Sequence, residues 1–256
     1  MYIWDWFSPD YNCPTMERIG RVGDGGKWIC GVDVLRSRKC LAYSYGVNKD
    51  LSFELEMIGR TGCEVHAFDP TVGGVPPDCK GNPHITFHKQ ALGPASGPTD
   101  VFMLVESLLD TMRRHNHTFI DVLKVDIEGS EWDTFRALLP EKALPFGQLL
   151  IELHFRDVAE VFEFFENMDT HGFRVFMRET NHNPCAAGKL PIAVEFSLVN
   201  PDAYFKGLPA PAAVQAVAAR PTPTAYKGAI YVLSQKHNIE RCVRASVCLL
   251  GMDRAL

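Results

Sequence analysis

The chain has 256 residues, 46% of them hydrophobic, with a formal net charge of −5 and a sequence pI near 6.0. This composition supports one large domain with its own core and excludes a disordered or fibrous protein. The negative charge excludes a broad cationic surface, so we expect no nucleic-acid partner. No run of about 18 apolar residues occurs, so we expect no membrane span. The composition leaves the oligomeric state open.

The eight cysteines include no C-x-x-C pair, so we expect no zinc knuckle and assign no metal site. Eight is many for a cytosolic chain of this length, and Cys30 could pair with Cys40 across a short loop, unless the thiols are free and buried. The segment Met1 to Asp10 is aromatic and acidic, unlike a signal peptide. We therefore expect a cytoplasmic protein if the N-terminus is complete, and the secretory pathway if the cysteines are oxidised.

Four segments follow one another along the chain. Residues 1–39 are predicted to form an N-terminal extension, in which Asp24 to Lys27 is either a lid over a ligand or a surface hairpin turn. Residues 40–206 form the main domain. Residues 207–228 are rich in Ala and Pro and are interpreted as a linker, because Pro disrupts helix interiors and sheet ladders. Residues 229–256 form a tail whose role the sequence does not indicate.

In the main domain, short β-rich runs alternate with helical runs, which predicts an α/β fold with a mostly parallel sheet and helices on both faces. We predict seven strands, at Cys40 to Tyr45, Glu64 to Phe68, Ile85 to His88, Val122 to Ile127, Leu149 to Leu153, Arg174 to Met177 and Val194 to Val199. We predict helices at Leu51 to Arg60, Ser107 to Arg114, Ser130 to Leu139 and Val158 to Met168.

Ligands of open parallel sheets bind beyond the carboxyl ends of the strands, so the residues that follow each strand are the candidates for a site. After the first strand, Gly46 permits close approach of a ligand to the backbone, and Asn48 or Asp50 can cap the next helix. Only one glycine is present, so an ordinary turn is the alternative. Asp69 follows the second strand, 23 residues after Gly46. This is close to the spacing of about 20 at which a carboxylate binds a ribose diol.

The fourth strand ends with two carboxylates. Asp126 and Glu128 are two residues apart, so a continuing strand would place both on one side, and Gly129 permits the turn into a helix. This pair could orient an amino group, hold an acceptor hydroxyl or bind a divalent cation. Lys124 has the same parity, and an ion pair between Lys124 and Asp126 or Glu128 is the alternative.

The fifth strand ends with Glu152 and His154, which also share one side. A histidine of ordinary pKa can accept a proton from a hydroxyl, although a lone histidine at a strand end is more often structural. Glu131 lies in the first turn of the next predicted helix, where it interacts favourably with the helix dipole. Glu195 lies inside the last predicted strand and needs a partner there or must face the site.

At these residues the sequence resembles the FkbM-type methyltransferases, and more closely a eukaryotic methyltransferase-like branch of them. The matching segments lie between about residues 18 and 200 in the expected order: D-G-G-K-W-I-C at 24–30, Y-S-Y-G-V at 43–47, S-F-E at 52–54, V-H-A-F-D-P at 65–70, L-K-V-D-I-E-G-S-E at 123–131 and I-E-L-H at 151–154.

The resemblance implies a Rossmann-like class I methyltransferase fold, with seven strands of which the last is antiparallel, and S-adenosylmethionine as the methyl donor. Carried over by position, it assigns the methionine part of the donor to Tyr45, Gly46 and Asn48, the ribose to Asp69, the adenine to Gln90 and Ala91, and the donor or acceptor side to Asp126.

The resemblance further implies methyl transfer to a hydroxyl oxygen, because FkbM-type enzymes mainly methylate hydroxyls. We expect a small-molecule or glycan acceptor, His154 as the base, and Asp126 or Glu128 as the next candidates. One alternative is a nicotinamide-dependent oxidoreductase, which the spacing of Gly46 and Asp69 favours and the missing glycines oppose. Another is a non-catalytic binding domain on the same fold.

Overall fold

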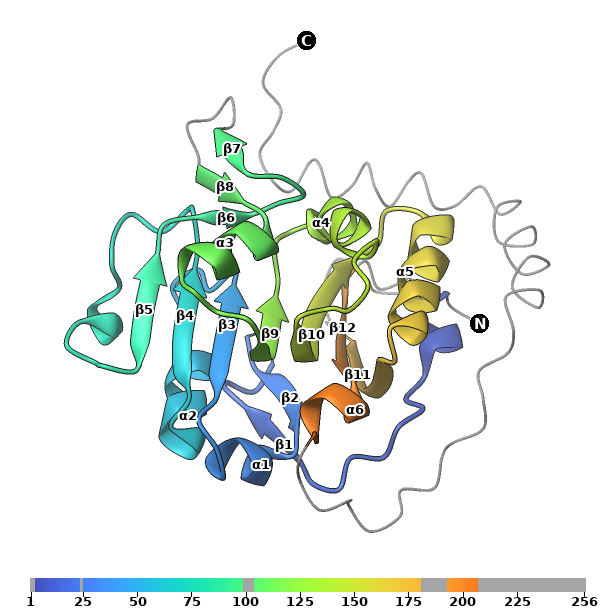
Figure 1. The fold of residues 1–256 in the computed structure, drawn as a ribbon, viewed down its shortest axis with the longest axis horizontal. Coiled ribbons are helices and arrows are strands. Elements are labelled where there is room, and N and C mark those ends of the chain that lie inside the picture. Colours follow the sequence, from blue (N-terminus) through green and yellow to red (C-terminus); the bar gives the residue numbers. More distant parts are fainter. Residues whose placement is uncertain (1–2, 24, 99–103, 181–192, 207–256) are drawn as a thin grey trace.

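The computed structural model describes residues 3–23, 25–98, 104–180 and 193–206 (Figure 1). The predicted linker, 207–228, and the predicted tail, 229–256, lie outside the described residues.

The core of the molecule is a seven-stranded sheet in the order β11-β12-β10-β9-β3-β4-β5. All of its neighbouring pairs are parallel except those of β12, which runs antiparallel to both β10 and β11. The α/β fold class and the single antiparallel strand are therefore confirmed. The strands are β3 (Leu41–Tyr45), β4 (Glu64–Phe68), β5 (Ile85–His88), β9 (Ile120–Val125), β10 (Phe146–His154), β11 (Arg174–Thr180) and β12 (Ala193–Val199).

Helices cover both faces of this sheet, and each face has its own apolar core (Figure 1). Alternate residues of a strand enter opposite cores: in β9, Leu123 packs on one side and Val122 on the other. One core holds residues of η1 (Ile3–Phe7), α3 (Leu108–Arg114), α4 (Glu131–Leu138) and α5 (Val158–Thr170), and the other holds residues of α1 (Val32–Arg36), α2 (Ser52–Thr61) and α6 (Pro201–Tyr204).

Helix α5 shows why the local hydrophobic pattern was sufficient to predict the longer helices and strands. Its five buried residues, Val161, Phe162, Phe164, Phe165 and Met168, recur with helical spacing and form one apolar face. The helix begins where Asp157 accepts hydrogen bonds from the backbone N–H groups of Ala159 and Glu160.

Several short elements were not predicted from the sequence. Two of them, β1 (Met16–Ile19) and β2 (Lys27–Cys30), form an antiparallel hairpin within the predicted N-terminal extension, which agrees with the hairpin-turn alternative for residues 24–27. The hairpin packs on the main sheet, where the Gln148 side chain bonds both the N–H and the carbonyl of Cys30 at 2.9 Å. Three others, β6 (Ala91–Leu92), β7 (Gly97–Pro98) and β8 (Leu104–Glu106), make a small separate sheet. Strands of two or three residues, such as β6, β7 and β8, are too short to show a clear period. A single-turn 3-10 helix, η2 (Pro77–Cys79), lies in the loop between β4 and β5.

The cysteine pairing predicted between Cys30 and Cys40 is wrong. Cys30 pairs with Cys13, with Cα atoms 5.5 Å apart, and Cys40 pairs with Cys63, with Cα atoms 4.7 Å apart. Cys40 and Cys63 precede the neighbouring parallel strands β3 and β4, so the sheet itself brings them together. Closing these loops stabilises the fold by roughly 3 kcal/mol each on the chain-entropy account. Cys79 is free and buried.

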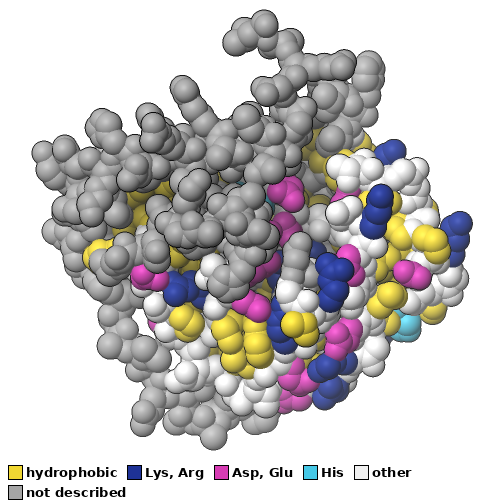
Figure 2. Space-filling view, turned by 180° about the vertical axis from the view of Figure 1, so that it is seen from behind, with side chains coloured by type: hydrophobic (Ala, Val, Ile, Leu, Met, Phe, Trp, Pro, Cys, Tyr) yellow, Lys and Arg dark blue, Asp and Glu magenta, His cyan; other side chains and the backbone are white. Residues whose placement is uncertain are grey.

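Acidic and basic side chains are interspersed on the coloured part of the face seen in Figure 2, without a patch of one sign. Within the described residues, no helix has the length and apolar character needed to cross a membrane.

Candidate functional site

The turn after β3 and the end of β9 touch each other at the carboxyl edge of the sheet. The N–H of Gly46 donates to the carbonyl of Phe68 at 3.0 Å, and the N–H of Asp126 donates to the carbonyl of Tyr45 at 3.1 Å. Gly46 has φ +79°, and a Cβ atom there would lie 1.6 Å from the carbonyl oxygen of Asp126. Glycine is thus required by the approach of the chain to itself, a reason that the sequence did not indicate.

Asp69 connects the ends of β3 and β4. Its Oδ2 accepts the N–H of Asn48 at 2.7 Å, and its Oδ1 accepts the N–H and the hydroxyl of Thr71. Asn48 adopts the left-handed region, with φ 48°. Each carboxylate oxygen can accept about two hydrogen bonds, so Oδ2 keeps one acceptor position for a ligand hydroxyl. Tyr45 differs, because its ring is buried and stacked on Phe68 at 4.3 Å, which leaves only its backbone for a ligand.

Gln90 and Ala91 follow β5, next to the end of that strand. The buried side chain of Gln90 donates to Thr111 Oγ1 at 2.8 Å and accepts from Arg114. These hydrogen bonds hold the side-chain amide of Gln90 against α3. Only the backbone of Gln90 is therefore left to contact an adenine ring. Ala91 opens β6 and has no polar side chain to offer.

Asp126 is paired with a lysine that the sequence interpretation did not single out, although it belongs to the D-G-G-K motif. The Nζ atom of Lys27, at the start of β2, lies 3.5 Å from Asp126 Oδ2 and donates a hydrogen bond to Glu195. The Lys27 side chain is only 2% exposed. Glu195 therefore has the partner that its place inside a strand required.

Lys27, Asp126 and Glu195 shift one another's pKa values. Burial opposes the charge of Lys27, but Glu195 and Asp126 outweigh it and raise the pKa of the ammonium group. Burial also opposes the charge of Asp126, but Lys27 and Lys124 outweigh it and lower the pKa of this carboxyl. Burial raises the pKa of Glu195. Lys27 thus keeps an ionised carboxylate in place at the edge of the sheet.

Lys124 does not form the ion pair with Asp126 or Glu128 that we considered from its parity. Its Nζ atom lies 3.8 Å from Glu54 Oε1, in α2, and 3.4 Å from the carbonyl oxygen of Gly46. Both side chains of this pair are buried beneath the turn that contains Gly46. Helix α2 thus supplies the partner, and only the packed fold brings it to β9.

His154, at the end of β10, lies among carboxylates. Its Nε2 is 3.3 Å from Glu128 Oε2 and 3.9 Å from Glu152 Oε2, and its Nδ1 is 3.2 Å from Glu131 Oε1. Burial by itself would lower the pKa of His154, but the bonds to Glu128 and Glu131 outweigh it and raise this pKa to about 11. The ring is thus protonated at neutral pH and has no lone pair with which to accept a proton.

The acidic neighbours of His154 differ from the sequence expectation in two ways. β9 ends at Val125, so strand parity does not extend to Glu128, which has φ 56° and an 83% exposed side chain in the following turn. Glu131 does more than interact with a helix dipole: its carboxylate is fully buried and also accepts the N–H of Ile127 at 3.0 Å. Asp126, Glu152 and His154 each offer an atom within 4.8 Å of the other two.

We expect the stability of the protein to fall as the pH rises from about 7 toward about 10. The folded-state pKa of His154, about 11, lies above the unfolded value of 6.5, so its stabilising contribution is complete below 6.5 and is lost toward 11. Urea unfolding at several pH values measures this slope. His154→Gln should flatten it, whereas His84→Gln, at an exposed site, should not. Equal slopes in the unmodified protein and in both variants would contradict the raised pKa of His154.

A second group of titratable residues was missed entirely by the sequence interpretation. His66 in β4, His88 at the end of β5, and His115 and His117 between α3 and β9 gather on one face of the sheet. Burial lowers the pKa of His66 and His115, and lowers that of His88 to about 3. No pattern in the sequence could have indicated this group, because its members belong to three separate segments.

Comparison with known proteins agrees with this architecture. A family model described as a methyltransferase domain matches residues 1–190. The probable methyltransferase-like protein 24 of Homo sapiens and that of Rattus norvegicus are each 32% identical to the chain over 127 residues, or 47% of this chain. The match covers 34% of each relative, so the chain spans about a third of the length of these curated relatives.

Two solved structures show a more distant likeness. A methyltransferase FkbM from Methylobacillus flagellatus KT is 17% identical, with a TM-score of 0.40 over 62% of this chain and 43% of that chain. The TrmK protein of M. capricolum, in complex with S-adenosylhomocysteine, is 8% identical, with a TM-score of 0.43 over 66% of this chain and 67% of that chain.

The fold defines an α/β protein of the Rossmann-like class I type, with polar residues gathered at the carboxyl edge of its sheet. The chain belongs to the methyltransferase domain family. The resemblance predicted from its motifs is thereby confirmed.

Proposed function

We propose that this domain is an S-adenosylmethionine-dependent methyltransferase that methylates a hydroxyl group of a small-molecule or glycan acceptor. One observation carries the proposal: the carboxyl ends of four strands bring together the Gly46 turn, Asp69, Asp126 and His154. This is the edge at which open α/β sheets bind their ligands. Membership of the methyltransferase domain family supports the same activity.

The residues at this edge fit the chemistry of the donor. S-adenosylmethionine has a ribose diol and an ammonium group, which donate hydrogen bonds, and when bound it supplies a methyl group on a positively charged sulfur. Asp69 Oδ2 keeps an acceptor position for the diol. Asp126 is held ionised by Lys27, and Glu152 lies beside it, so acidic groups face the cationic end of the donor.

The protonation state of His154 changes the candidate for the base. A ring with a pKa of about 11 carries its proton at neutral pH, so we assign His154 a positioning role, in which it holds Glu128 and Glu152. The acceptor hydroxyl then hydrogen-bonds to the carboxylate of Asp126, which accepts its proton as the methyl group is transferred. The alignment of the donor's methyl group with the acceptor hydroxyl supplies most of the remaining rate acceleration.

Calorimetric titration of the chain with S-adenosylmethionine, S-adenosylhomocysteine and NAD tests the donor. We expect the first two to bind and NAD not to bind. Asp69→Ala should weaken donor binding by about 10-fold or more, because it removes a charged hydrogen-bond acceptor. Asp78→Ala, at an exposed acidic residue in η2, is the matched control and should bind as the unmodified chain does.

The same titrations separate the alternatives. Binding of NAD without binding of S-adenosylmethionine would indicate a nicotinamide-dependent oxidoreductase, the alternative that the spacing of Gly46 and Asp69 favours. Binding of none of the three would indicate a non-catalytic domain. Circular dichroism of Asp69→Ala shows whether weaker binding reflects the lost carboxylate or a lost fold.

The two disulfides bear on the compartment. Because disulfides persist in oxidising surroundings, we further propose that the protein acts in the secretory pathway. Peptide mapping of the protein from its native cells, without reductant, should recover the Cys13–Cys30 and Cys40–Cys63 links. Recovery of all four residues as free thiols would argue for a reducing compartment.

A further inference from the structure

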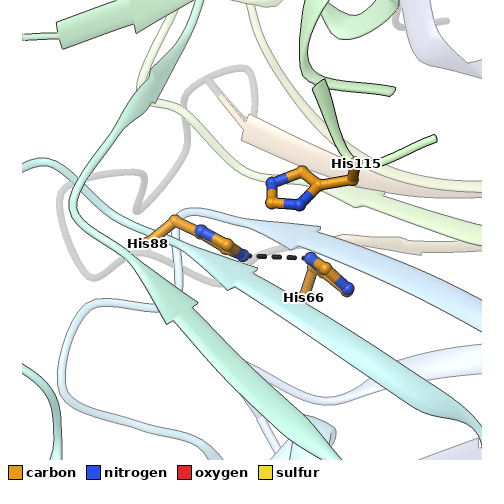
Figure 3. Close-up of side chains that lie close together, drawn as sticks. All are labelled: His66, His88 and His115. Atoms are coloured by element: carbon orange, nitrogen blue, oxygen red, sulfur yellow. Dashed lines mark hydrogen bonds between the residues drawn. The ribbon is translucent and has the colours of Figure 1, made fainter. Parts of the chain in front are cut away.

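Three imidazole rings converge on one point between the sheet and the segment that follows α3. His66, His88 and His115 point toward one another (Figure 3). His66 Nδ1 lies 3.0 Å from His88 Nε2, and the ring of His115 has its centroid 4.8 Å from that of His66 and 4.7 Å from that of His88. His115 Nε2 is buried and has no hydrogen-bond partner among the described residues.

We propose that His66, His88 and His115 bind one divalent transition-metal ion of the Zn²⁺ type. Each ring offers one nitrogen, and the three nitrogens lie within 4.8 Å of one another. Nitrogens bound tetrahedrally at about 2.0–2.1 Å from zinc lie roughly 3.3 Å apart. The pair His66 and His88 already has nearly this spacing, so His115 is the ring that moves inward. It is followed by Asn116, which has a left-handed φ of 57° and ends the helix.

The residues around the three rings suit metal binding. His66 Nε2 lies 3.0 Å from Glu64 Oε1, so in the neutral ring Nε2–H donates a hydrogen bond to the carboxylate and Nδ1 keeps a lone pair. A carboxylate behind a histidine ligand orients the ring and raises its basicity. Arg114, the adjacent cation, is paired with Glu106 at 3.1 Å.

An open pocket lies beside two neighbours of the three rings. Glu64 and His117 line an open pocket at the amino ends of the strands, and the hydroxyl of Tyr43 bonds His117 Nδ1 at 2.7 Å. A second possible group, Glu64, His66 and His117, shares His66 with the first. In that second group Glu64 would bind the ion, whereas here it holds His66, so the two arrangements exclude each other.

The bound ion would tie the segment after α3 to the outer strands β4 and β5. The site shares no residue with the group of Asp126, Glu152 and His154, so it is independent of the proposed methyl transfer. We expected no metal site because the cysteines lack the spacing of a zinc knuckle. The proposed site uses histidines only, so that argument does not apply to it. Soft or borderline divalent ions are the class to which neutral imidazole binds well.

Titration of the chelator-treated chain with Zn²⁺, and with Co²⁺ as a coloured substitute, tests the site. We expect one ion per chain at this site. Glu64→Gln should weaken binding by about 10–100-fold, and His88→Gln or His115→Gln by more, because these remove a ligand itself. His84→Gln, at an exposed histidine of the same region, should bind as the unmodified chain does.

Histidine ¹H–¹⁵N spectra of the unmodified chain give a readout that needs no variant. Saturation with Zn²⁺ should shift His66 Nδ1 and His88 Nε2 and leave His84 and His171 unchanged. The proposal is overturned if no ion binds, if these nitrogens do not shift, or if His88→Gln and His115→Gln bind normally. It is equally overturned if His154→Gln abolishes binding, because the ion would then lie at the carboxyl edge.

Discussion

Lys27→Met lowers the free energy of unfolding by about 3–5 kcal/mol. The substitution keeps the volume and apolar stem of the side chain but removes the cation that contacts Asp126 and Glu195. The buried carboxylate of Glu195 and the partly buried carboxylate of Asp126 then lack their counter-charge, which is the costly way to break a buried ion pair. Urea unfolding at neutral pH measures the loss. It should shrink as the pH is lowered, because protonation of the two carboxyl groups relieves the unpaired charge.

The control for this substitution is Lys49→Met, at an exposed lysine, which should change stability by no more than about 0.5 kcal/mol. A Lys27→Met protein as stable as the unmodified chain would mean that this pair is not formed as described. A loss that does not depend on pH would assign the effect to packing of the stem instead of to charge.

Gly46→Ala lowers the free energy of unfolding by about 2–5 kcal/mol, as the sum of left-handed backbone strain and overpacking. The added methyl group would start 1.6 Å from the carbonyl oxygen of Asp126, so either the turn after β3 or the end of β9 must move. Because both carry residues of the proposed donor site, donor binding should be lost together with stability. Thermal unfolding and the calorimetric titration measure the two effects.

Substitutions at two other glycines distinguish backbone strain from steric overlap. Gly129 has φ +100° but open space around its Cβ position, so Gly129→Ala should cost only about 1–2 kcal/mol. Gly59 lies within α2, also in open space, and Gly59→Ala should stabilise the helix by about 0.5–1 kcal/mol. If Gly46→Ala costs no more than Gly129→Ala, the contact between Gly46 and Asp126 does not constrain the fold.

The main sheet and its helices could be predicted because their signals are local. β4 and β5 have the predicted bounds, and β9 and β10 differ only at their ends. The buried strands are continuous apolar runs, and α5 shows its apolar face within thirteen residues. For the N-terminal hairpin only the turn was considered from the sequence, because the position of its strands depends on contacts of β2 with β10 and β12.

The candidate site was predictable to the extent that parallel topology places strand ends together. Asp69, Asp126, Glu152 and His154 could be chosen from the sequence, because each follows or ends a strand of recognisable pattern. Their chemical states were not predictable. His154 was expected to be a base, and its pKa is set by Glu128 and Glu131, whose approach depends on a turn that breaks the strand parity.

The sequence by itself thus determined the fold class, the order of the elements and the edge at which we propose that a ligand binds, since these follow from periodicity and from the topology of parallel sheets. Only the tertiary structure decided which side chains are partners. Lys27 meets Asp126 across 99 residues and Glu195 across 168, Cys40 pairs with Cys63 instead of Cys30, and histidines from three segments share one point. The physical reason is that charge pairing, disulfide bonding and metal binding depend on distances of a few Å between side chains. These distances exist only after the elements have packed.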